Sequence, residues 1–152
     1  MGFTNRGAFL AFDAYFANQT EPANFFVALF TSATTPTVDT NTLSQLTQVA
    51  TGNGYVDGGI SVARDTTDWD SRVEDDTDDR AEFQIKDLVF TASGGPIPAS
   101  GNGARWAALT TDEVTVANRQ IIAFFDLVSD RTVSSGQTLT LQNLEVQGDT
   151  VP

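Results

Sequence analysis

The sequence predicts a mainly β protein, an antiparallel, jelly-roll-like β-sandwich with one N-terminal helix. Residues 138–146 open with alternating Thr and Leu, which places Leu139 and Leu141 on one face of a strand. Residues 24–32 are apolar on both faces and too short to cross a membrane, as expected for a strand covered on both sides. Turns rich in Gly separate such segments, which is typical of two packed antiparallel sheets.

Size and composition favour a single domain, residues 1–152, without chemistry that depends on His or Cys. A chain of 152 residues can bury about 70% of its unfolded surface. Eleven Phe and two Trp supply bulky core material, and there is neither Cys nor His. This composition excludes disulfides, thiolate nucleophiles, Ser-His-Asp triads and His-zinc sites. We therefore expect no catalytic residue, no metal and no cofactor, and the protein is not expected to be an enzyme.

The net charge limits the classes of partner that the protein is expected to bind. Twenty acidic residues against eight basic ones give a net charge of −12, which disfavours direct binding to nucleic acid or to an anionic membrane surface. No apolar run approaches the ~20 residues of a membrane-spanning helix. Asp13 interrupts the first apolar stretch, so no secretion signal is expected. Other proteins are therefore the expected class of partner.

A helix is predicted over about residues 4–17, with Thr4 or Asn5 as its cap. Its Phe residues recur at i, i+3 and i+7, which puts three rings on one side of the helix: Phe9, Phe12 and Phe16. The simpler interpretation packs these rings on the domain's own sheet, over the second face of residues 24–32. The alternative is a Phe-rich arm that docks on a neighbouring subunit.

Two segments follow the first strand. Residues 33–42 form a loop rich in Thr and Pro. Leu43, Leu46 and Val49 are then spaced by three, which predicts a short helix capped by Thr42. Gly-rich turns lead from there to a strand that begins at Ile60.

Residues 65–80 carry eight acidic residues and two Arg. Like charges at this density repel one another, so the segment is predicted to be a solvated acidic loop. The alternative is a Ca²⁺ site built on Asp68 and Asp70, although the order of a known calcium loop is missing. Trp69, in the middle of the segment, is expected to pack down or to mark a contact.

A further strand is predicted over residues 81–92. Phe83 and Ile85 share one face, and the apolar residues that follow are one step out of phase, so a bulge is expected at Lys86–Asp87. Residues 93–103 form a Gly/Pro loop that contains Pro96 and Pro98.

Two later segments complete the predicted sheets. Residues 104–110 and 120–127 have the composition of strands. In all, seven or eight strands are expected.

The order of these features resembles a family of small virion structural proteins of tailed bacteriophages. The resemblance rests on FFVALFTS, then GNGYVDGGISVAR, then RTVSSGQTLTL, and it covers the chain from about Thr4 to Leu144. Proteins of this family are described as virion structural, tail-fibre or head-decoration proteins. The resemblance therefore implies a place in a virion more firmly than it implies which part of the virion.

The leading hypothesis is a capsid decoration or cement protein on the exterior of the capsid. Its partners would be the major capsid protein and further copies of itself, as a dimer or trimer, and it would stabilise the shell by buried contact area. The expected contact residues lie in the N-terminal helix, the acidic segment and the Gly/Pro loop: Phe9, Phe12, Phe16, Trp69, Pro96 and Pro98.

Three alternatives remain open. A tail-tip, baseplate or fibre component would contact host glycans through Trp69, Trp106 or Tyr55. A carboxylate-based glycoside hydrolase would need a raised pKa at Glu113 or Glu82 in an apolar cleft. A free carbohydrate-binding module would bind glycans without any virion.

Overall fold

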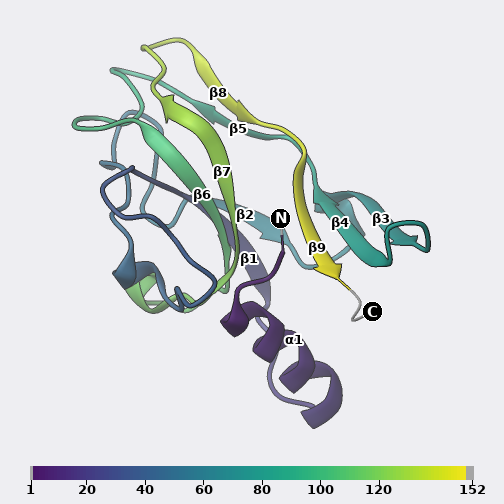
Figure 1. Cartoon of the computed structure of the whole chain (residues 1–152). Coiled ribbons are helices and arrows are strands. Elements are labelled where there is room, and N and C mark those ends of the chain that lie inside the picture. Colours follow the sequence, from purple (N-terminus) through teal and green to yellow (C-terminus); the bar gives the residue numbers. More distant parts are fainter. Residues whose placement is uncertain (1, 150–152) are drawn as a thin grey trace.

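The computed structural model describes residues 2–149 and is a mainly β, antiparallel sandwich with an N-terminal helix, as predicted (Figure 1). One layer is a four-stranded sheet in the order β2-β1-β6-β7. Neighbouring strands pair antiparallel throughout. The bounds are β1 Asn24–Phe30, β2 Ile60–Ala63, β6 Ala104–Thr110 and β7 Ile121–Arg131.

The second layer is divided into two short sheets. β3 (Trp69–Asp75), β4 (Arg80–Ile85) and β9 (Leu144–Asp149) form one of them. β5 (Leu88–Thr91) and β8 (Thr138–Leu141) form the other.

The predicted bulge at Lys86–Asp87 is therefore wrong. At that point the chain leaves the ladder of β4 with β9 and joins the ladder of β5 with β8. Between β8 and β9, at Gln142–Asn143, the chain passes back from the sheet of β5 and β8 to the sheet of β3, β4 and β9. A side-chain hydrogen bond from Gln142 to Asp87 (2.7 Å) spans the break. The slip of phase in the sequence marks a change of sheet.

The main core lies between the two layers. Val27, Leu29 and Val62 enter it from the four-stranded sheet, and Ile85 and Leu88 enter from the divided layer, all of them 0–2% exposed. Phe83 was expected to share the core with Ile85, but it is 43% exposed. It lies instead against Trp69.

β1 is covered on both faces, as predicted, but the cover of its second face is not α1. Ala28 and Phe30 belong to a second buried cluster with Leu43 and Leu46. The segment after β1 folds back over the sheet and donates from the Val49 N–H to the Leu29 carbonyl (3.1 Å).

The helix predicted for residues 43–49 is only one 3₁₀ turn, η1 (Leu43–Gln45). The Gln45 side chain accepts from the Thr42 N–H (2.9 Å), and the turn ends at Leu46, which has an extended backbone. A second 3₁₀ turn, η3 (Val116–Asn118), precedes β7.

Most of the acidic segment is not a loop. A 3₁₀ turn, η2 (Thr66–Asp68), leads into β3, which pairs with β4 as an antiparallel hairpin. β3 is an edge strand and most of its residues are exposed or half-buried. Its carboxylates stay in water, so their repulsion is too weak to prevent pairing, and charges on an edge strand also discourage unwanted pairing.

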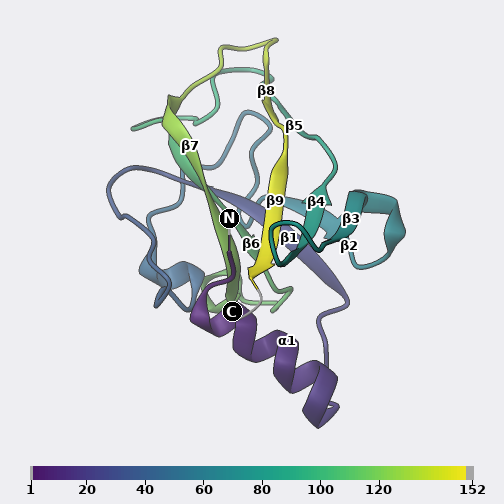
Figure 2. The same ribbon diagram turned by 45° about the vertical axis from the view of Figure 1, so that its right-hand side comes forward.

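α1 spans Asn5–Ala17, which confirms the predicted helix. It stands at one end of the sandwich and runs away from the sheets (Figures 1 and 2). Within residues 2–149, no helix has the length and apolar character required to cross a membrane.

Candidate interaction surface

The first turn of α1 fixes the helix to β7. The buried Thr4 is the N-cap, and its N–H donates to the Ile122 carbonyl (2.9 Å). Its hydroxyl donates to the Ile121 carbonyl (2.5 Å) and accepts from the Gly7 N–H (2.9 Å). A Cβ at Gly7 would lie 2.2 Å from the Ile122 carbonyl oxygen, so only Gly allows this close approach.

Two polar contacts brace the same turn. The Asn5 N–H donates to the Val38 carbonyl (2.8 Å), and its side-chain amide donates to Asp39 (2.7 Å). The Arg6 guanidinium donates to the Gln120 side chain. The direction in which α1 leaves the sandwich is thus set by residues on two separate segments, 38–39 and 120–122.

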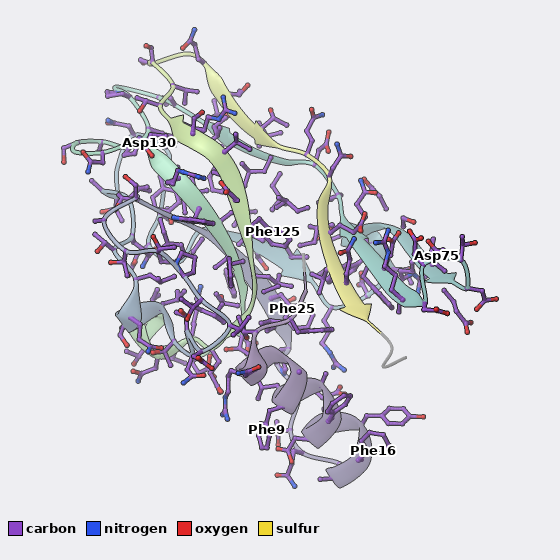
Figure 3. The ribbon with its side chains drawn as sticks, viewed as in Figure 1. Phe9, Phe16, Phe25, Asp75, Phe125 and Asp130 are labelled. Carbon is purple, nitrogen blue, oxygen red and sulfur yellow. The ribbon has the colours of Figure 1, made fainter. Side chains whose placement is uncertain are left out.

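Beyond the first turn, α1 carries an exposed aromatic face. Its four rings are 52–84% exposed: Phe9, Phe12, Tyr15 and Phe16. Phe16 packs edge-on against Tyr15, with ring centroids 5.1 Å apart, and Phe12 lies 6.0 Å from Phe16. Figure 3 shows Phe9 and Phe16 on the helix, remote from the sheets. The expectation that the Phe stripe packs on the domain's own sheet is therefore wrong.

The opposite side of α1 borders an apolar groove of about 730 Å³. The helix side of the groove is formed by Gly7, Leu10, Ala11 and Ala14, with Tyr15 at its edge. Three aromatic residues from β1, β3 and β4 line it from the sandwich side: Phe25, Trp69 and Phe83. The groove lies between the helix and the sandwich, at the end of the molecule where α1 projects.

Trp69 organises the aromatic wall of this groove. Its ring meets Phe25 and Phe83 edge-on, at centroid distances of 6.2 and 6.0 Å. Its indole N–H donates to the Ala63 carbonyl (3.1 Å), which satisfies the polar end of the side chain. Trp69 was predicted to pack down or to mark a contact, and it lies in the wall of the groove.

The charges that line the groove are balanced in sign. Arg64 forms an ion pair with Glu21, and Arg72 and Asp65 also line the groove. This neutrality contrasts with the net charge of −12 of the whole chain.

Asp68 has a role inside the fold. The side chain is buried, and it accepts from the Ala63 N–H (2.7 Å) and from the Lys86 ammonium. These two donors hold the pKa of the Asp68 carboxyl below its usual value, although burial acts in the opposite direction. Among residues 2–149, no three acidic side chains gather closely enough to hold a metal ion.

The two carboxylates considered for hydrolysis are both engaged. Burial acts to raise the pKa of Glu113, but the Thr111 hydroxyl and the Gln120 amide donate to its carboxylate and hold the pKa below its usual value. Glu82 forms an ion pair with Arg80. A general acid in a glycosidase needs a raised pKa, which Glu113 does not have.

Two of the three candidate stacking residues are part of the packing. Tyr55 is 2% exposed, and its hydroxyl oxygen accepts from the Leu29 N–H (2.9 Å). Burial raises the pKa of this hydroxyl. Trp106 is half-buried, packs on Phe124 at a centroid distance of 6.0 Å and is covered by the Arg105 guanidinium.

The predicted contact residues divide between two ends of the molecule. The Gly/Pro loop between β5 and β6 lies at the end away from α1 (Figures 1 and 2). Pro98 is buried there, and Pro96 accepts through its carbonyl from the Asn53 side chain (2.9 Å). The three Phe residues and Trp69 share one end, whereas the two Pro residues do not belong to the same surface.

Sequence reasoning placed Tyr15 beside the three Phe residues on the helix, and Tyr15 is indeed exposed there, but it missed the groove altogether. Gly7 was a usable signal for how α1 is seated, because a Gly inside a helix costs about 1 kcal/mol relative to Ala and calls for a packing reason. No protein-family model, curated protein or solved structure matches this chain.

Proposed function

We propose that this protein is a structural component of a tailed-bacteriophage virion, most specifically a decoration protein on the capsid exterior, and that it acts without catalysis. It would stabilise the shell through contacts with the major capsid protein and with other copies of itself. The resemblance of the ordered motifs supports the virion, and the surface of α1 supports the contact role.

The observation that carries the proposal is the exposed aromatic face of α1. Four rings that are 52–84% exposed leave roughly 500 Å² of apolar surface in water, since a buried aromatic side chain covers 150–250 Å². A patch of this size matches the largest apolar patch of a typical soluble protein, which is often functional. The rings stand on a helix whose base is locked to β7, so the surface is preorganised for a partner.

Charge supports an exterior position. The remaining surface is strongly acidic, and the hairpin of β3 with β4 concentrates much of that charge. Like-charged particles repel one another, so an acidic outer coat would keep virions apart in solution.

A tail-tip, baseplate or fibre component is the alternative within the same class. It would need exposed stacking residues for host glycans. Of the three residues expected to stack on glycans, Tyr55 is buried, Trp106 is covered by Arg105 and Trp69 lines the groove. A glycan would therefore have to stack on the exposed rings of α1 instead.

Purified protein mixed with decoration-stripped capsids of the phage that encodes it tests the proposal. Co-sedimentation at physiological salt should saturate at a fixed number of copies per capsid. The variant Phe12→Ser/Phe16→Ser should bind at least tenfold more weakly, because each buried Phe contributes about 1.5–3 kcal/mol. The matched control is Val128→Ser, which removes an exposed apolar side chain on β7. An absence of binding to capsids at physiological salt would contradict the capsid role.

A further inference from the structure

We propose that the apolar groove binds the aromatic face of α1 from a second copy of this chain, and that two copies do so reciprocally in a two-fold pair. The inference rests on the proposed function in one respect: it names a second copy as the first partner in an assembly that works by contact.

The helix cannot place its three exposed Phe rings in its own groove, whereas Tyr15 lies at the edge of that groove. With about 3.6 residues per turn, the side of α1 that carries Leu10 and Ala14 points nearly opposite to the side that carries Phe12 and Phe16. The hydrogen bonds of Thr4 and the close approach of Gly7 fix the rotation of the helix about its axis. Only another molecule can therefore cover these Phe rings.

The groove has the chemistry to receive such rings. One side presents small residues, Ala11 and Ala14, which leave room for a bulky neighbour. The other side presents the edges and faces of Phe25, Trp69 and Phe83. Aromatic rings meet such walls in edge-to-face geometry, which adds to the gain from burial.

A two-fold axis satisfies both surfaces at once. In the pair, each α1 stays seated on its own β7, and its Phe rings reach into the groove of the other copy. Each aromatic face then meets the aromatic wall of the other copy.

Electrostatics direct self-association to this end. α1 carries one Arg and one Asp, so it is neutral, and the rim of the groove pairs Arg64 with Glu21. The chain as a whole carries −12, and contacts between two copies elsewhere would bring like charges together. The helix and the groove form a neutral surface on an acidic molecule.

The area is also sufficient. Each aromatic face would remove roughly 500 Å² from water, so reciprocal insertion buries about 1,000 Å² on the two helices alone. The walls of the two grooves add to this figure. The total reaches the ~1,200–2,000 Å² of stable, specific interfaces.

Sedimentation equilibrium on the purified chain gives the first test. The wild type should be a dimer that dissociates on dilution, and Phe12→Ser/Phe16→Ser should weaken the dimer at least a hundredfold. Ala14→Trp, which fills the groove and leaves the rings intact, should have the same effect. Val128→Ser is the control and should leave the dimer unchanged.

Disulfide trapping identifies the contact itself, and it is clean because the chain has no Cys. A mixture of the Phe16→Cys and Phe83→Cys proteins should form a mixed disulfide-linked dimer under mild oxidation. A mixture of Val128→Cys and Phe83→Cys should not.

A wild type that is monomeric throughout the dilution series would overturn the inference, as would a dimer that the helix and groove variants leave intact. A monomer that still saturates stripped capsids would reject the contact between helix and groove and leave the virion role standing. A dimer that forms the expected cross-link but does not bind stripped capsids would reject the virion role and leave the contact between helix and groove standing.

Discussion

Tyr55 is a buried polar group on which the main sheet depends. It is 2% exposed and its hydroxyl oxygen accepts from the Leu29 N–H at 2.9 Å. Tyr55→Phe keeps the ring but leaves that backbone donor without a partner, so we expect a loss of about 1–3 kcal/mol in the free energy of unfolding. Urea denaturation measures this change.

The chain supplies its own control for this substitution. Tyr15 is 84% exposed, so Tyr15→Phe should leave the stability unchanged within about 0.5 kcal/mol. Equal effects of the two substitutions would contradict the structural role of Tyr55.

Asp68 makes the stability depend on pH. The Ala63 N–H and the Lys86 ammonium hold its pKa below the unfolded value, which is about 3.9. Its contribution is therefore complete above that value and is lost as the pH falls through the lower, folded-state pKa. Asp68→Asn should lower the stability at neutral pH and flatten the loss of stability in acid.

Denaturation midpoints between about pH 7 and pH 2 check this expectation. Asp70→Asn is the matched control, because Asp70 is exposed on β3, and it should retain the acid profile of the wild type. A profile for Asp68→Asn parallel to that of the wild type would contradict the assignment.

At the scale of elements, α1 depends on one close contact. Ala normally favours a helix over Gly by about 1 kcal/mol, but at Gly7 a Cβ would lie 2.2 Å from the Ile122 carbonyl oxygen. The clash should dominate, and Gly7→Ala should cost about 1–3 kcal/mol of stability. Hydrogen exchange should show earlier loss of protection in the first turn of α1.

Gly2→Ala is the control, because its Cβ would meet its nearest atom at 3.8 Å. It should change neither the thermal midpoint nor the exchange pattern. An increase in stability for Gly7→Ala would show that α1 is not seated against β7.

Elements with strong patterns could be predicted from the sequence. The apolar run of β1, the alternation of β8 and the composition of β6 each report burial on a sheet. β3 could not be predicted. Its dense charges indicate repulsion, but the sequence does not show that the strand lies at the edge of a sheet, where water weakens that repulsion. The change of sheet at Lys86–Asp87 appeared in the sequence only as a slip of phase.

The candidate site was predictable in part. Periodicity correctly grouped Phe9, Phe12 and Phe16 on one side of a helix. It could not say which way that side faces, since the rotation of α1 is set by backbone contacts of Thr4 and Gly7 with a strand more than a hundred residues away. The wall of the groove is formed by residues of three strands, β1, β3 and β4, and no local sequence pattern predicts that these residues lie together.

For the whole molecule, the two ends differ in kind. One end presents a neutral, aromatic helix and an apolar groove, and the acidic hairpin lies beside them. The other end presents loops that are pinned by backbone hydrogen bonds, as where Ile97 pairs with Val133 at 2.9 and 3.0 Å. This difference between the two ends suits a protein that joins an assembly by one end.

Electron cryomicroscopy of purified tailed-bacteriophage particles whose genome carries this sequence is the sharpest test of the proposed place on a capsid. We expect density for this sandwich at regular positions on the outside of the capsid, with the aromatic face of α1 buried at a contact between subunits. Purified particles that lack the chain, or that carry it with α1 free in solvent, would contradict the account.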